Sequence, residues 1–171
     1  MSNDPIPGPR AVPPPAILLE PVRHFLTGHK MPFREGNGVL SVGVPLPGDG
    51  NELVVARFRA GGGNRGITAR VTSPRVISKA EVPRAALAAN QWNAGHLAPR
   101  AVLVPRTESE GSGLLLDAWL PASPRIEQPQ VDLFIVAVLR GARAFWGAVT
   151  LGSIPGEGPP PQPETDAEPF G

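Results

Sequence analysis

This chain of 171 residues contains no cysteine. Disulfide bonds, thiolate metal sites and a cysteine nucleophile are therefore excluded. Only three histidines are present, His24, His29 and His96, and the two that are close in sequence stand five residues apart. Two ligands on one helical face need i, i+4 spacing, so the histidines do not predict a metal site.

The signatures of catalysis and of membrane insertion are equally scarce. No serine lies in a G-x-S-x-G elbow, paired carboxylates are not evident, and no apolar run approaches the ~20 residues of a membrane span. The glycine-rich stretch Gly61–Gly66 lacks the Lys-Ser/Thr pair of a phosphate loop, and a strand pattern follows it, so it is typical of a hairpin connection. We expect a cytoplasmic protein without a signal peptide, and not an enzyme, with no cofactor and no metal.

Proline (23 residues) and glycine (20 residues) are abundant, and proline gathers at the two ends of the chain. This composition predicts a disordered tail over residues 1–15, a folded domain over 16–151 and a second disordered tail over 152–171. The second tail holds four acidic residues and no basic one, and the charges of the first tail cancel. Removing the four acidic charges from a total of +1 leaves +5 for the body, an excess that could favour acidic partners or attract the acidic tail onto the body.

Hydrophobic periodicity and turn residues predict the order helix, four strands, helix, two strands, helix. The expected helices are Ala16–Thr27, Pro83–Asn93 and Gln128–Val149, and Pro21 favours a later start of the first one, near Glu20. The expected strands are Met31–Glu35, Val39–Leu46, Glu52–Ala60, Gly66–Val76, Ala101–Thr107 and Gly113–Leu120. Tight turns between consecutive strands predict an α+β domain with an antiparallel sheet and flanking helices.

The last helix carries two apolar stripes. The first includes Ile135, Val138 and Phe145, and the second includes Leu133 and Val136. A helix that is apolar nearly all round is buried on two sides. One side can meet the sheet, and the other needs the first helix or another subunit, so we expect a homodimer.

The stretch Asn90-Gln91-Trp92-Asn93 closes the second predicted helix. Together with the strand after Ala98–Ala101, the strand Leu114–Leu120 and the Phe145-Trp146 pair, it resembles the YbjN-like family, bacterial domains described as sensory transduction regulators. The resemblance covers roughly Val22 to Val149. It implies a fold similar to that of the peptide-binding chaperones of type III secretion, and it brings no catalytic residues.

Two groups of residues are candidates for binding. In the third strand Arg57 and Arg59 share a face, opposite to Val54 and Phe58, and Arg70 could lie beside them on the paired strand. Together with Arg75, these three arginines would form a basic sheet surface able to bind carboxylates. The alternative interpretation is an ordinary solvated face of the sheet without a ligand. Asp117 shares a face with Leu115 and Trp119, where it could pair with an arginine across the sheet.

Asn90, Trp92 and Asn93 form the second group. In the structural interpretation Trp92 fills the core and the amides bond to neighbouring backbone at the helix end. In the functional interpretation the amides clamp the backbone of a bound peptide.

These observations predict a non-enzymatic protein- or peptide-binding module, chaperone-like or regulatory, whose partner the sequence does not name. The alternative is a nucleic-acid-binding or signalling regulator that uses the basic sheet face. Nucleic acid is the weaker expectation because aromatic residues do not interleave with the arginines in sequence.

Overall fold

The computed structural model describes residues 14–47, 52–61, 63, 65–73, 75–105, 111–122 and 126–150. The tails expected at 1–15 and 152–171 lie outside these residues, apart from residues 14 and 15. The helices are α1 (Pro15–Gly28), α2 (Val82–Gly95) and α3 (Gln128–Thr150). The strands are β1 (Phe33–Gly36), β2 (Val39–Pro45), β3 (Leu53–Gly61), β4 (Gly66–Thr72), β5 (Arg100–Pro105) and β6 (Ser112–Pro121).

The strands form one antiparallel sheet of six strands in the order β1-β2-β3-β4-β6-β5. The α+β class and the predicted order of elements are confirmed. The chain passes from β4 through α2 to the far edge of the sheet at β5, and then returns as β6 between β4 and β5. This return places Asp117 of β6 directly opposite Arg70 of β4.

Turn chemistry fixes the hairpins. Asn37 and Gly38 have φ values of 51° and 70°, the left-handed pair that a tight β-hairpin turn requires. The glycine-rich stretch joins β3 to β4, with Gly61 paired to Gly66 and the Arg65 N–H bonded to the Gly61 carbonyl at 3.0 Å. The predicted hairpin connection is therefore confirmed.

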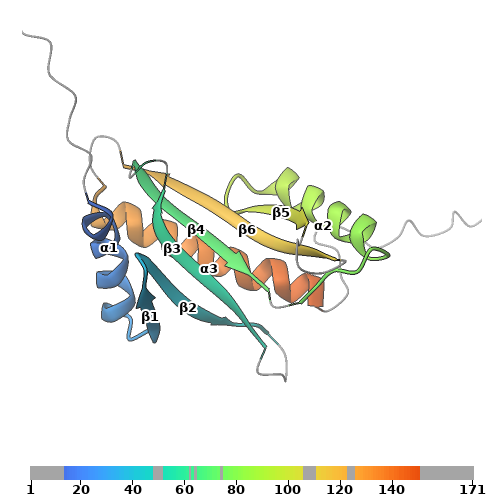
Figure 1. The fold of residues 1–171 in the computed structure, drawn as a ribbon, viewed down its shortest axis with the longest axis horizontal. Coiled ribbons are helices and arrows are strands. Elements are labelled where there is room, and N and C mark those ends of the chain that lie inside the picture. Colours follow the sequence, from blue (N-terminus) through green and yellow to red (C-terminus); the bar gives the residue numbers. More distant parts are fainter. Residues whose placement is uncertain are drawn as a thin grey trace, which may run out of the picture.

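One face of the sheet forms the core with the helices. In Figure 1 α3 runs behind the strands and α1 lies next to β1–β3. The central strands send alternate residues into this core, among them Val54, Ala56 and Phe58 of β3, and Phe58 meets Phe134 of α3 edge-on at 6.5 Å between ring centroids. The alternation predicted for β3 is thus confirmed. We call the opposite side of the sheet the outer face.

Two predicted boundaries were wrong by more than two residues. Helix α1 begins at Pro15 and continues through Pro21. Proline has no backbone N–H and removes one helical hydrogen bond. Burial of Leu18, Leu19 and Val22, on either side of Pro21, offsets that loss. Strand β4 ends at Thr72, not at Val76. There the Ser73 hydroxyl accepts a hydrogen bond from the Arg75 N–H at 3.1 Å, a local turn that competes with the strand ladder.

Helix α3 places its first predicted stripe inside the protein. Ile135, Val138 and Phe145 are buried, whereas Leu133 of the second stripe is 72% exposed. Helix α1 contacts one side of α3 and leaves this part of the second stripe uncovered. The homodimer stays a prediction. No helix in the described ranges is both long and apolar enough to cross a membrane.

Gly141, inside α3, is expected to resist substitution by alanine. A Cβ atom here would stand 2.8 Å from Cδ and 2.9 Å from Cγ of Pro99. Alanine normally favours a helix over glycine by ~1 kcal/mol, but crowding against a packed ring costs about 1–3 kcal/mol. We therefore expect Gly141→Ala to lower the melting temperature, as measured by circular dichroism.

Gly95, at the end of α2, is the matched control because a Cβ there would meet nothing within 4 Å. Gly95→Ala should leave the melting temperature unchanged or raise it. A Gly141→Ala protein more stable than the parent would contradict the close packing of α3 on Pro99.

Candidate functional site

A row of arginines crosses the outer face of the sheet. The register aligns, strand by strand, Arg34, Ser41, Arg57, Arg70, Asp117 and Arg100. All four arginines of this row are exposed. Arg59 lies on the same face of β3, two residues further along. We call Arg34, Arg57, Arg59, Arg70 and Arg100 the arginine row.

The arginine row is only partly neutralised. Asp117 is its one acidic neighbour on the described strands of this face, and its Oδ1 accepts a hydrogen bond from Arg70 Nε at 3.2 Å. Arg57 donates to the hydroxyl of Thr72 at 2.8 Å, a bond that orients the guanidinium without cancelling its charge. Five guanidinium groups against one carboxylate make this face a surface suited to binding anions.

Apolar side chains accompany the arginines. Val55 and Val102 lie at the next outward-facing position along their strands, two residues from the row, and Val102 is 39% exposed. Trp119 is 56% exposed on the same face, opposite Thr68. A ligand on this face would therefore meet both charge and apolar surface.

The sequence placed part of this surface correctly. Arg57 and Arg70 are directly paired and Arg59 is beside them, as the strand pattern predicts, and Asp117 does pair with an arginine across the sheet. Sequence reasoning missed Arg34 and Arg100. Their place in the row depends on which strands become neighbours, although their position in short alternating runs signals the face they occupy.

Arg75 was wrongly placed on the basic face. It lies beyond the end of β4, and its Nη2 is 2.5 Å from a carboxylate oxygen of Glu81, at the start of α2. That carboxylate also accepts hydrogen bonds from the Ser78 N–H at 3.0 Å and the Ser78 hydroxyl at 2.7 Å. The bonds from Ser78, followed by the one from Arg75, lower the pKa of Glu81 to about 2.

A pH-dependent effect on stability follows from this depressed pKa. The ionised Glu81 stabilises the folded state above its ordinary pKa of 4.5, and this contribution is lost as the pH falls through about 2. We expect Glu81→Gln to be less stable than the parent at neutral pH, and the difference to shrink as the pH is lowered from 4.5 towards 2. Urea unfolding across this pH range would measure it, and a difference independent of pH would contradict the proposed bonds.

Trp92 and Asn93 have structural roles. Trp92 is 3% exposed, donates from its indole Nε1 to the Pro99 carbonyl at 2.7 Å and meets Phe145 edge-on. The Asn93 amide bonds to both backbone groups of Ala101, at 2.9 Å to the carbonyl and 2.8 Å from the N–H. These contacts agree with the structural interpretation, and a peptide-binding role of the two residues stays a prediction. Asn90 is exposed, and its peptide-binding role stays a prediction.

The Asn93 bonds also protect one edge of the sheet. Strand β5 is an edge strand, and edge strands offer unpaired N–H and C=O groups to other chains. Here the backbone groups of Ala101 are taken by Asn93, and Pro105 has no N–H to donate. Addition of a partner strand along β5 is therefore disfavoured.

Two of the three histidines, His29 and His96, lie at helix ends. His29 Nδ1 lies 2.9 Å from the Phe25 carbonyl oxygen, and His96 Nδ1 lies 2.9 Å from the Trp92 carbonyl oxygen. Each imidazole stacks on the aromatic ring four residues earlier, at 4.1 Å and 3.6 Å between centroids. Within the described ranges, no three side chains of histidine, cysteine, aspartate or glutamate gather at one point.

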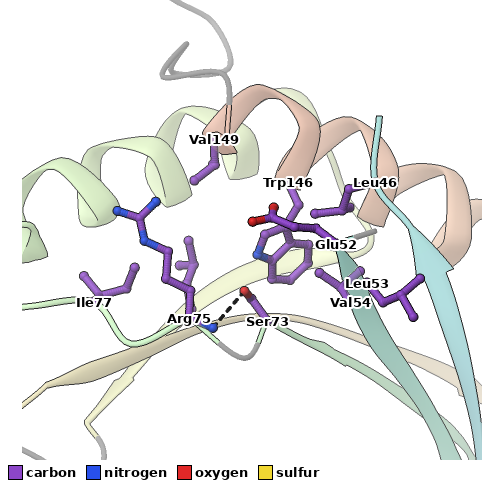
Figure 2. Close-up of a pocket in the computed structure, with 10 residues that line it drawn as sticks. Leu46, Glu52, Leu53, Val54, Ser73, Arg75, Ile77, Trp146 and Val149 are labelled. Atoms are coloured by element: carbon purple, nitrogen blue, oxygen red, sulfur yellow. Dashed lines mark hydrogen bonds between the residues drawn. The ribbon is translucent and has the colours of Figure 1, made fainter. Parts of the chain in front are cut away.

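A pocket of about 140 Å³ opens where β3 begins and α3 ends. We call it the end pocket. Figure 2 shows the Trp146 indole ring reaching into it from α3, with the Arg75 and Glu52 side chains near its rim. Most of the remaining lining is aliphatic: Leu46, Leu53, Val54, Ile77, Leu114 and Val149. Leu53 belongs to the outer face and Val54 to the core, so the pocket lies where the two faces of the sheet meet.

A second, shallower hollow of about 560 Å³ lies on the outer face itself, over β1, β2 and β3. Arg34 and Arg57 line it, together with Ser41, Gly43 and Val55. The row of arginines thus borders a concave surface, as a bound segment would require.

This fold belongs to a known class: a helix-backed antiparallel sheet with the strand order described above. The crystal structure of YbjN from E. coli, described as a candidate transcription regulator, matches it with a TM-score of 0.63 and 20% sequence identity, over 83% of this chain and 95% of that one. The YbjN-like resemblance is thus confirmed for the fold. No protein-family model matches the chain, and no curated protein matches it either.

Proposed function

We propose that this protein is a non-enzymatic binding module that holds an extended acidic segment of a partner protein on its outer face. The observation that carries the proposal is the arginine row. Four of its members lie on one line that runs from β1 to β5 across all six strands. A regulatory or adaptor role fits such a module.

The spacing of the row suits a short peptide. Neighbouring strands lie ~4.8 Å apart, so the line from β1 to β5 is ~24 Å long, the length of roughly seven extended residues. Carboxylates on such a segment would each gain a charge-assisted hydrogen bond from a guanidinium, while Val55 and Val102 would contact its apolar side chains. Arginine suits this role because its donors form a planar fork that matches a carboxylate.

Single-stranded nucleic acid is the second candidate, and one observation favours it. Trp119 is an exposed aromatic residue on the same face as the arginines, where a base could stack on it. The structurally similar YbjN is described as a candidate transcription regulator. The peptide is preferred because Trp119 is the only aromatic side chain on the described strands of the outer face, whereas single-strand binders stack successive bases.

Titration with a labelled probe tests the proposal. The probe peptide is a fluorescein-labelled peptide of alternating glutamate and alanine, roughly eight residues long, and its control has glutamine in place of glutamate. Fluorescence anisotropy should rise with the probe peptide and not with the control, and the affinity should fall as salt screens the charges. Preferential binding of a labelled single-stranded oligonucleotide, weakened strongly by Trp119→Ala, would replace the peptide proposal by the nucleic-acid one.

A further inference from the structure

The last residues of the chain have the chemistry of a ligand for this surface. Glu164, Asp166, Glu168 and Phe170 occupy alternate positions, beyond the described residues. In an extended chain alternate side chains point to the same side, so three carboxylates and one aromatic ring can meet a surface together. No basic residue follows Gly152 to oppose them.

The described surface offers the complementary features at a matching distance. Arg57 and the outer-face residue Leu53, which lines the end pocket, are four residues apart on β3, a distance of ~13 Å along a strand. Asp166 and Phe170 are also four residues apart. The end pocket, at about 140 Å³, is close to the ~150 Å³ cavity that holds a benzene ring.

We propose that residues 164–170 bind along β3 on the outer face of their own chain, with Glu164 and Asp166 beside Arg59 and Arg57 of the arginine row and the Phe170 ring in the end pocket. This inference rests on the proposed function, since it assumes that the outer face binds acidic segments. The connection is long enough. Helix α3 ends at Thr150, fourteen residues before Glu164. Fourteen extended residues span up to ~46 Å. The chain must pass from the helix layer to the far side of the sheet, and each of these two layers is ~10 Å thick.

Such a segment is a built-in competitor. A tethered ligand acts at an effective concentration in the millimolar range, so even a weak contact keeps external peptides off the surface. A partner must then displace residues 164–170. We expect neutralisation of the three carboxylates (Glu164→Gln, Asp166→Asn and Glu168→Gln in one protein, the neutralised variant) to strengthen binding of the probe peptide about tenfold.

The absence of cysteine allows a direct test. Thr165→Cys in the full chain creates a unique attachment point for a spin label, on the side of the segment away from the carboxylates. Nuclear magnetic resonance should show broadened amide signals for Arg57 and Arg70, and unchanged signals for His24 in α1. The broadening should disappear in high salt and when the carboxylates are neutralised. Unbroadened arginine signals would overturn the inference.

Two further measurements separate the outcomes. In the first, spin-labelled protein without isotope enrichment is mixed with isotope-enriched protein that carries no spin label. Broadening of the isotope-enriched signals would then come from a neighbouring molecule, and this would overturn binding within one chain. Phe170→Ala should shift the signals of Trp146 and Val149 beside the end pocket, and unchanged signals would contradict the placement of the ring.

If the probe peptide binds the parent and the neutralised variant equally well, the inference fails and the proposed function stands. If it binds neither, the proposed function fails as well.

Discussion

Reversing two charges of the arginine row should abolish binding of the probe peptide. Arg57→Glu with Arg59→Glu removes two exposed guanidinium groups from the centre of the outer face and replaces them by carboxylates. Each lost charge-assisted hydrogen bond costs ~1.5–3 kcal/mol, and repulsion of the glutamates of the probe adds to that loss. We expect the affinity measured by anisotropy to fall at least ~100-fold.

Helix α3 supplies the matched control. Arg140 and Arg143 are exposed there, on a helix that packs against the opposite side of the sheet. Arg140→Glu with Arg143→Glu changes the net charge by the same amount, and we expect it to alter the affinity less than about threefold, because charges far from the ligand are screened by salt. Equal losses in the two double variants would mean that net charge alone attracts the probe, and would contradict a defined surface.

Removal of the Trp92 side chain should cause the largest loss of stability. Trp92→Ala empties a volume that packs against Phe145 and His96, and it removes the donor to the Pro99 carbonyl. Truncation of a buried tryptophan costs ~3–5 kcal/mol. For a domain of this size the melting temperature measured by calorimetry should fall by about 10 °C or more.

The same substitution at Trp119 is the control. Trp119 is 56% exposed and has no comparable burial to lose, so Trp119→Ala should change stability by less than ~1 kcal/mol. Trp92→Phe should lie between the two, since it keeps most of the volume but leaves the Pro99 carbonyl without its donor. A Trp92→Ala protein of normal stability would show that Trp92 is not part of the core.

The elements of the fold could be predicted from the sequence because their signals are local. Alternation within β3 separates Phe58 from Arg57, and Asn37-Gly38 marks a hairpin turn. What could not be predicted is the return of β6 between β4 and β5, since pairing between strands distant in sequence depends on the whole fold. For that reason Arg70 was placed beside Arg57 correctly, while Arg100, on the far side of β6, was not recognised.

The role of the N-x-W-N segment was undecided for a related reason. A helix end with two asparagines and a tryptophan has the same residues whether its amides face a ligand or a neighbouring strand. Only the position of β5 shows that Asn93 bonds to Ala101. The end pocket was missed because its lining comes from β3, β6, α3 and the segments after β2 and β4, which no sequence window brings together.

Mapping the bound probe peptide on the protein tests the central claim most directly. Two-dimensional nuclear magnetic resonance of isotope-enriched neutralised variant, titrated with the probe peptide, reports the position of the ligand residue by residue. The account predicts the largest amide shifts at Arg57, Arg70 and Asp117, with α1 and the exposed side of α3 unaffected. Shifts confined to the helices, or to Asn90 and its neighbours in α2, would contradict the outer face as the binding surface.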